Sequence, residues 1–92
     1  MAVYVDNMRC PYGRMFMSHM MADTEVVLHD MADRIGVARR WIQKSRKGLV
    51  HYDICQSKRA MAVRLGAVEV NQREVANLMR RLLHEDGSHT DA

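Results

Sequence analysis

The chain has 92 residues, which is enough for one domain but too short for two separate hydrophobic cores. Its 14 Lys and Arg outnumber 11 Asp and Glu, and the net charge of +3 favours anionic ligands while being less lopsided than that of a dedicated nucleic-acid binder. No run approaches the roughly 18 apolar residues that cross a bilayer and no leader opens the chain, so we expect a cytoplasmic protein without membrane contact.

The N-terminal part of the chain predicts two strands and a helix. Residues 2–5 are β-branched and aromatic, and residues 6–13 follow as a turn that contains Pro11 and Gly13. Residues 14–21 suit a second strand by their length. Asp23 or Thr24 is expected to cap a helix that ends at Gly36. The apolar face of this helix follows the helical spacing and consists of Leu28, Met31, Ala32 and Ile35.

The C-terminal part predicts two helices and further extended segments. Residues 40–43 are typical of a strand and precede a polar loop at residues 44–48, after which residues 50–53 are extended again. A helix is expected from about residue 56 to the stop at Gly66. Residues 67–70 predict another strand, and Asn71 with Glu74 forms a capping box at the start of a last helix.

The resulting order, β-β-α-β-α-β-α, predicts an α/β fold with a sheet of about four strands that is at least partly parallel. Residues 1–84 form this single domain, and the polar residues 85–92 are expected to be a disordered C-terminal tail. Open α/β sheets bind ligands beyond the carboxyl ends of their strands. We therefore expect Asp6, the loop 44–47 and the stretch 51–59 to meet on one rim.

His51-Tyr52-Asp53 is the densest group of chemically active side chains. In one interpretation, His51 and Asp53 are catalytic and perform acid-base chemistry near neutral pH. In a second, His51 and Asp53 bind a divalent metal together with His19. In the third, His51 and Tyr52 pack against the sheet while Asp53 caps a turn. The chain has no HxH or HExxH spacing, so no metal ligand is assigned from the sequence.

Cations are expected to supply the anion site. Lys58 and Arg59 lie in the first turn of a helix, where they oppose the helix dipole, and a bound phosphate would remove this conflict. Arg9 and Arg14 are expected to join them. The alternative is that Lys58 and Arg59 point to solvent or pair with Asp53 or Asp6, although surface ion pairs contribute little.

The remaining candidates have mostly structural interpretations. His19 alternates with Met17 and Met21, which favours a core histidine over a site residue. Trp41 is expected to be buried against a helix rather than stacked on a base. Cys10 and Cys55 form no CxxC pair and are expected to be reduced thiols, although Cys55 near a helix N-terminus could have a lowered pKa.

Several short motifs lie within about residues 2–70. They are Val3-Tyr4-Val5-Asp6, Gly13-Arg14, Ser18-His19-Met20, Ala22-Asp23, Leu28-His29, Trp41-Ile42-Gln43, His51-Tyr52-Asp53, Lys58-Arg59 and Gly66-Ala67. In this set the chain resembles a small bacterial and phage domain family of uncharacterised function. The resemblance implies that the polar positions recur together, as in a shared ligand site. Similar proteins often have Thr-Pro in place of Cys55-Gln56, so the helix cap is expected to be weaker here.

The sequence thus predicts a domain that binds a phosphorylated small molecule or a nucleotide. The expected ligand-binding residues are Asp6, Arg9, Arg14, His19, Tyr52, Lys58 and Arg59, beside His51 and Asp53. One alternative is a noncatalytic phage-type interaction protein that binds a protein or nucleic acid through its basic loops, and another is a metal-assisted phosphoester hydrolase. The Met-rich stretch 15–21 would serve the core or a homodimer contact, and no cofactor is identified.

Overall fold

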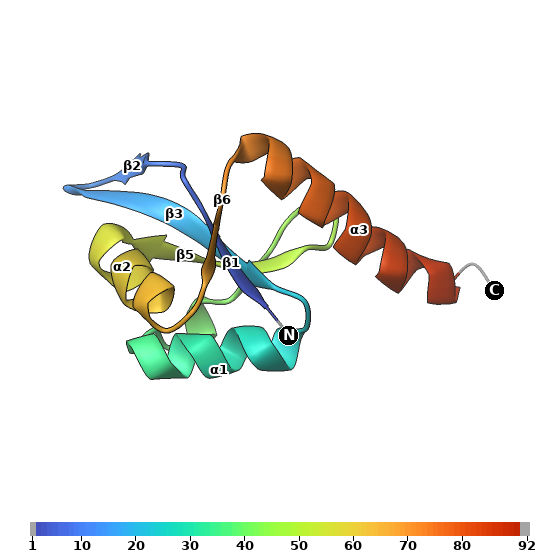
Figure 1. The fold of residues 1–92 in the computed structure, drawn as a ribbon, viewed down its shortest axis with the longest axis horizontal. Coiled ribbons are helices and arrows are strands. Elements are labelled where there is room, and N and C mark those ends of the chain that lie inside the picture. The colour runs from blue at the N-terminus through green and yellow to red at the C-terminus, as the bar shows by residue number, and fades with distance from the viewer. Residues whose placement is uncertain (1, 91–92) are drawn as a thin grey trace.

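The computed structural model describes residues 2–90, with side chains through residue 83. Its strands are β1 (Val3–Asp6), β2 (Cys10–Tyr12), β3 (Met15–Ala22), β4 (Gln43–Lys44), β5 (Val50–Cys55) and β6 (Val68–Val70). Its helices are α1 (Glu25–Ile35), α2 (Gln56–Arg64) and α3 (Gln72–Thr90), with a 3-10 turn at Arg39–Trp41. The helices α1 and α2 pack on one face of the sheet and α3 on the other (Figure 1). The predicted α/β class is confirmed.

The sheet is mixed, with the order β4-β5-β3-β1-β6, and β2 pairs with β3 to form a hairpin. Only β1 and β6 pair in parallel among the described strands, and the other pairs are antiparallel. The predicted partly parallel sheet is confirmed, but the strand count of about four is wrong, because the described residues form six strands.

Two strand predictions failed for local reasons: β2 was not predicted, and residues 40–43 were predicted as a strand but begin in a turn. The strand β2 contains Pro11, which is tolerated in a short edge strand because its missing N–H group would face away from the ladder. Residues 40–43 were expected to be extended, but the N–H groups of Trp41 and Ile42 donate to Ala38 and Arg39, which closes a 3-10 turn. Trp41 is consequently 59% exposed, so its predicted burial against a helix is wrong.

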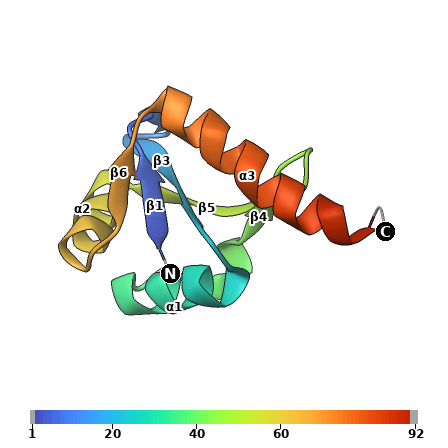
Figure 2. The same ribbon diagram turned by 45° about the vertical axis from the view of Figure 1, so that its right-hand side comes forward.

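Strand register divides the sheet residues between two cores. Val5, Met20, Tyr52 and Ile54 face α1 and α2 in the larger core. Met21 faces α3 in a smaller core with Leu49 and Leu82. Figure 2 shows α1 and α3 on opposite sides of the strands. Because alternate residues of a strand point to opposite faces, the residues that alternate with the larger core must point toward the α3 side.

The helix ends agree with the sequence signals. The Thr24 hydroxyl accepts from the N–H group of Val27 at 3.3 Å, and Gly36 adopts the left-handed conformation with φ of 79°. Asn71 and Glu74 form the predicted capping box, with reciprocal bonds of 2.9 and 3.0 Å. Cys55 makes no side-chain cap bond to α2, which agrees with the weaker cap expected there.

The backbone of α3 is helical to Thr90, so the predicted tail boundary at residue 85 does not coincide with the end of the helix. The side chains of this predicted tail lie outside the described residues, and its disorder stays a prediction. Within the described part of the chain, no helix combines the length and apolar character that a bilayer crossing requires.

Leu28 is expected to be a principal stabilising residue of α1, since only 1% of its surface is exposed. Leu28→Ala should lower the free energy of unfolding by about 2–5 kcal/mol, because it removes buried methyl groups and leaves a cavity. Val26→Ala is the matched control on the same helix, since Val26 is 79% exposed. Urea denaturation measures both variants, and equal effects would contradict this packing.

Candidate functional site

Four polar side chains from three adjacent strands gather on the α3 side of the sheet. His19 on β3 lies directly opposite Asp53 on β5. Asp6 ends β1, one residue beyond the Val5–Met20 pair, and so lies beside His19. His51 precedes Asp53 by two residues and therefore shares its face of β5. The register thus brings together Asp6, His19, His51 and Asp53, which the sequence proposed as site residues.

Asp6 orients the imidazole of His19. Its Oδ2 atom lies 2.7 Å from Nδ1 of His19, and its Oδ1 atom accepts from the N–H groups of His19 at 2.9 Å and Met8 at 3.3 Å. Burial raises the pKa of Asp6, but the hydrogen bonds and charge of His19 outweigh it and lower the pKa overall. The hydrogen bond to Asp6 raises the pKa of His19 despite partial burial. An ionised Asp6 can only accept, so Nδ1 of His19 carries a hydrogen and Nε2 points away from Asp6.

Asp53 presents one carboxylate oxygen that has no hydrogen-bond partner. Its Oδ2 atom accepts from Nε2 of Gln43 at 2.9 Å. Its Oδ1 atom is buried and has no hydrogen-bond partner. Among the described residues, no other buried side-chain oxygen or nitrogen lacks a hydrogen bond. The Nε2 atoms of His19 and His51 each lie 3.6 Å from this Oδ1, which is too long for a hydrogen bond. A buried carboxylate oxygen without a partner is costly unless a cation balances it.

The three side chains have a spacing that suits a divalent metal. Ligand atoms of His19, His51 and Asp53 all lie within 4.8 Å of one another. Metal–ligand bonds of about 2.0–2.2 Å in a tetrahedral zinc site put neighbouring ligand atoms about 3.3–3.6 Å apart, close to the two separations of 3.6 Å found here. Small side-chain rotations would therefore complete the site.

The second nitrogen of each histidine meets an acceptor, as metal-binding histidines require. Nδ1 of His19 has the Asp6 carboxylate, and Nδ1 of His51 lies 3.4 Å from the carbonyl oxygen of Leu49. Such contacts fix the tautomer and leave Nε2 free to bind a metal. The side chains of His19 and Asp53 are about one-third exposed, so a bound metal would keep positions open toward solvent.

Two cavities adjoin this cluster. One has a volume of about 250 Å³ and includes Asp6, His19 and His51 in its wall, with residues of α3 on the other side. The second has a volume of about 340 Å³ and includes Asp53 and Gln43. The cluster therefore lies between two spaces that are large enough for parts of a small ligand.

The predicted cations do not join the cluster. Arg59 donates from Nε to the carbonyl oxygen of Asp6 at 2.8 Å and from Nη1 to Glu69 at 3.0 Å, so it supports the end of β1. Nζ of Lys58 lies beside Gly36, at the C-terminal end of α1. Arg9 stacks on Phe16, with its guanidinium carbon 5.0 Å from the ring centre. Arg14 is exposed in the turn between β2 and β3. Their roles in anion binding stay predictions.

Tyr52 lies on the opposite face of the sheet. It is fully buried in the larger core, and its hydroxyl lies 2.6 Å from Nδ1 of His29 on α1. The structure thus separates Tyr52 from His51 and Asp53, although the three are consecutive. Gln43, which was not predicted as a site residue, also contacts the cluster through Asp53. The only signal for it was its place in the Trp-Ile-Gln motif, because its position opposite His51 depends on the register of β4.

Cys55 at the start of α2 is expected to be a reactive thiol. The hydrogen bond with the Ser57 hydroxyl, at 3.2 Å, and the backbone N–H group of Lys58 lower the pKa of Cys55. In a Cys10→Ser chain, the alkylation rate should therefore rise with pH at a midpoint below the ordinary value of about 8.5. Ser57→Ala should move this midpoint upward. A midpoint at or above the ordinary value in the Cys10→Ser chain would contradict the expectation.

Comparison with protein-family models matches residues 3–82 to a family described as "Protein of unknown function (DUF4031)". This range contains all four residues of the cluster. The search of curated proteins and the search of solved structures each found no match.

Proposed function

Since the chain belongs to the DUF4031 family of proteins of unknown function, we propose from its own side chains that it is a zinc-binding domain that hydrolyses phosphate esters. The proposed ligands are Nε2 of His19, Nε2 of His51 and Oδ1 of Asp53. Two imidazoles and one carboxylate, with an open fourth position, form a donor set typical of catalytic zinc sites. The proposal combines two expectations from the sequence. One is that His51 and Asp53 bind a metal with His19, and the other is that the net positive charge favours an anionic ligand.

The observation that carries the proposal is the environment of Asp53 Oδ1. This buried oxygen has no hydrogen-bond partner and faces two imidazole nitrogens at 3.6 Å. Packing alone does not explain why a sheet would keep this arrangement, because a buried carboxylate oxygen that accepts no hydrogen bond destabilises the fold. A divalent cation bound by all three side chains would remove that cost.

The chemistry follows from the position of the cluster. When bound, a divalent metal polarises a phosphoryl oxygen and lowers the pKa of a water molecule. His19 and His51 would enter the site as neutral ligands and Asp53 as an anion, so the metal with its three ligands would carry one positive charge that attracts a phosphate, while the Asp6 carboxylate behind His19 would offset part of it. The excess of basic residues would add to this attraction.

The experiment begins with the chelator-treated full chain. Calorimetric titration with Zn²⁺ should give one site per chain, and Zn²⁺ at 100 times its Kd should stabilise the fold by about 2.7 kcal/mol. For a domain of this size, the melting temperature should rise by about 10–20 °C. Hydrolysis of bis(p-nitrophenyl) phosphate should then require the metal. If zinc binds but no hydrolysis occurs, the metal site stands and the proposed catalysis is contradicted. If zinc does not bind, the whole proposal is contradicted.

The second candidate function is a noncatalytic interaction protein. The hairpin of β2 and β3 favours it, because Tyr12, Met15 and Phe16 are large apolar side chains left exposed there. The basic loop at residues 44–48 is the other surface expected to serve this candidate. A pull-down of a partner that is lost in Arg46→Glu and Lys47→Glu chains but kept in His51→Ala would support it. A homodimer and a cytoplasmic location stay predictions of the same kind.

A further inference from the structure

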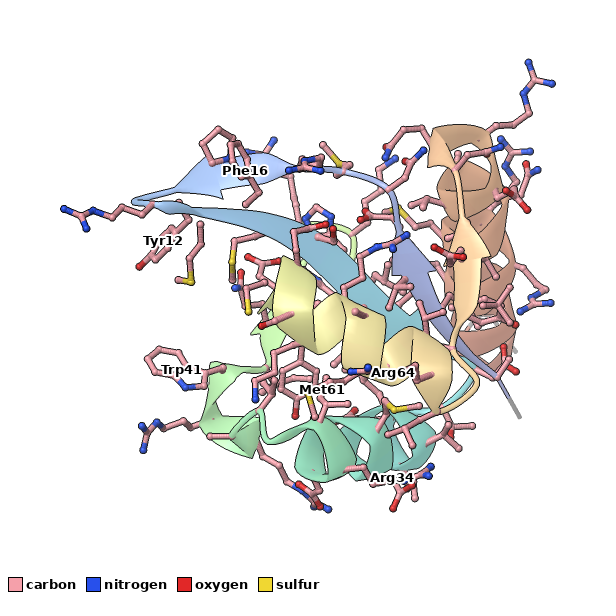
Figure 3. The ribbon with its side chains drawn as sticks, turned by 60° about the vertical axis from the view of Figure 1, so that its left-hand side comes forward. Tyr12, Phe16, Arg34, Trp41, Met61 and Arg64 are labelled. Carbon is pink, nitrogen blue, oxygen red and sulfur yellow. The ribbon has the colours of Figure 1, made fainter. Side chains whose placement is uncertain are left out.

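A second pocket shares Asp53 with the proposed metal site. Its volume is about 340 Å³, and its wall consists of Tyr12, Met17, Val37, Trp41, Gln43 and Asp53. Tyr12 comes from β2 and Trp41 from the turn after α1, and both project on the same side of the molecule (Figure 3). The pocket therefore begins at the metal ligand and opens between two aromatic side chains.

From this arrangement we propose that the pocket holds a nucleobase, so that the ligand of the metal site is a nucleotide. The proposal rests on the proposed function for the phosphate half of the ligand. It adds a recognition site for the other half, which Tyr12 and Trp41 would provide by stacking on the base. Such stacking on an aromatic side chain contributes substantially to the binding of each base and tolerates different bases.

The exposure of the two aromatic side chains supports a ligand that stacks on them. Tyr12 is 70% exposed and Trp41 is 59% exposed, although both rings are large enough to fill a core. Neither ring contributes to the two hydrophobic cores among the described residues. The volume of the pocket lies near the lower end of the range of about 300–1,000 Å³ for small-molecule sites. It suits one ring system better than a protein segment.

The polar groups of the pocket favour a nucleotide over a plain hydrocarbon ring. The Gln43 amide donates one hydrogen to Asp53 Oδ2. Its second Nε2 hydrogen and its Oε1 atom can pair with the polar edge of a base. The guanidinium carbon of Arg40 lies 5.2 Å from the centre of the Trp41 ring and adds positive charge at the rim. Because Arg40 lies over one face of the Trp41 ring, a base would stack on the other face.

The test compares adenosine monophosphate with ribose 5-phosphate, which has the same phosphate and sugar but no base. Both are titrated into the zinc-loaded full chain by calorimetry, and Trp41, as the single Trp, reports stacking through its fluorescence. We expect the nucleotide to bind at least tenfold more tightly. Equal affinities of the two compounds in a chain that takes up zinc would overturn the nucleobase pocket and leave the proposed function standing.

Variants separate stacking from the rest of the site. Trp41→Ala and Tyr12→Ala should bring the two affinities within threefold while the zinc affinity stays unchanged, and Trp41→Phe should keep most of the preference. Phe16→Ala is the control on the same hairpin. Tyr12 pairs with Met15 and shares its face, whereas Phe16 is the next residue along β3 and points to the other face (Figure 3). A preference that survives Trp41→Ala would overturn the pocket.

Failure of the proposed function gives a different result. A chain that binds no zinc but still binds the nucleotide in a Trp41-dependent way would contradict the metal site and support the nucleobase pocket. A chain that binds neither zinc nor the nucleotide would contradict both proposals.

Discussion

Asp53→Asn is expected to abolish zinc binding while leaving the fold intact. The substitution keeps the shape of the side chain, and the amide oxygen can still accept the hydrogen bond from Gln43 that Asp53 accepts at 2.9 Å. It removes the negative charge and replaces one possible ligand oxygen by an amide nitrogen. Loss of an outer partner already costs about 10–100-fold in metal affinity, so loss of the charged ligand should cost more than about 100-fold. Calorimetric titration with Zn²⁺ measures the effect.

The matched control is Asp30→Asn, which neutralises an exposed carboxylate on α1. It changes the net charge by the same amount and should leave the zinc affinity unchanged. The melting temperature of the metal-free Asp53→Asn chain should equal or exceed that of the native chain, because the substitution removes a buried carboxylate oxygen that accepts no hydrogen bond. Zinc binding that persists in Asp53→Asn would contradict the assignment of this ligand.

Local signals in the sequence were sufficient to predict the three helices and both ends of α1, although not the C-terminal end of α3. Thr24 and Gly36 bound α1, and Asn71 with Glu74 starts α3, because a cap depends on residues only a few positions apart. The strands were harder to predict. The strand β2 lies within a segment that carries Pro11 and Gly13, and β4 is only two residues long. Both exist because a neighbouring strand pairs with them, which no local pattern reveals.

The site was predicted only in part, because some of its contacts are local in sequence and others depend on strand pairing. His51 and Asp53 are two residues apart, so their presence on one face follows from the strand alone. The contact between Asp6 and His19 joins residues from different strands and depends on the register of β1 with β3. The Met residues around His19 favoured a core histidine, since the sequence could not show that β3 has a buried face on one side and this polar cluster on the other.

The structure places Lys58 and Arg59 away from the cluster. Lys58 and Arg59 were placed on the rim because they begin a helix, but α2 packs on the face of the sheet opposite His19 and His51. From that side, Arg59 contacts Asp6 through its backbone carbonyl oxygen and also pairs with Glu69. An anion at the cluster would therefore depend chiefly on a bound metal for its positive charge.

Asp6→Asn provides the sharpest test of how the site is organised, because it should reverse the tautomer of His19. Oδ1 of Asp6 accepts from two backbone N–H groups, those of His19 and Met8, so the oxygen of an asparagine must stay in that position. Its amide nitrogen then replaces Oδ2, which lies 2.7 Å from Nδ1 of His19. An amide nitrogen only donates, so Nδ1 must become the acceptor and the ring hydrogen moves to Nε2.

A protonated Nε2 has no lone pair for a metal, so Asp6→Asn should lower the zinc affinity by about 10–100-fold although residue 6 does not touch the metal. Nitrogen chemical shifts of the His19 ring, measured in the metal-free chain, should show hydrogen on Nδ1 in the native protein and on Nε2 in the variant. A purely structural role for Asp6 would lower the melting temperature without this exchange. Reversal of the tautomer with unchanged zinc affinity would exclude His19 as a ligand, whereas both changes together would show that Asp6 prepares His19 for the metal.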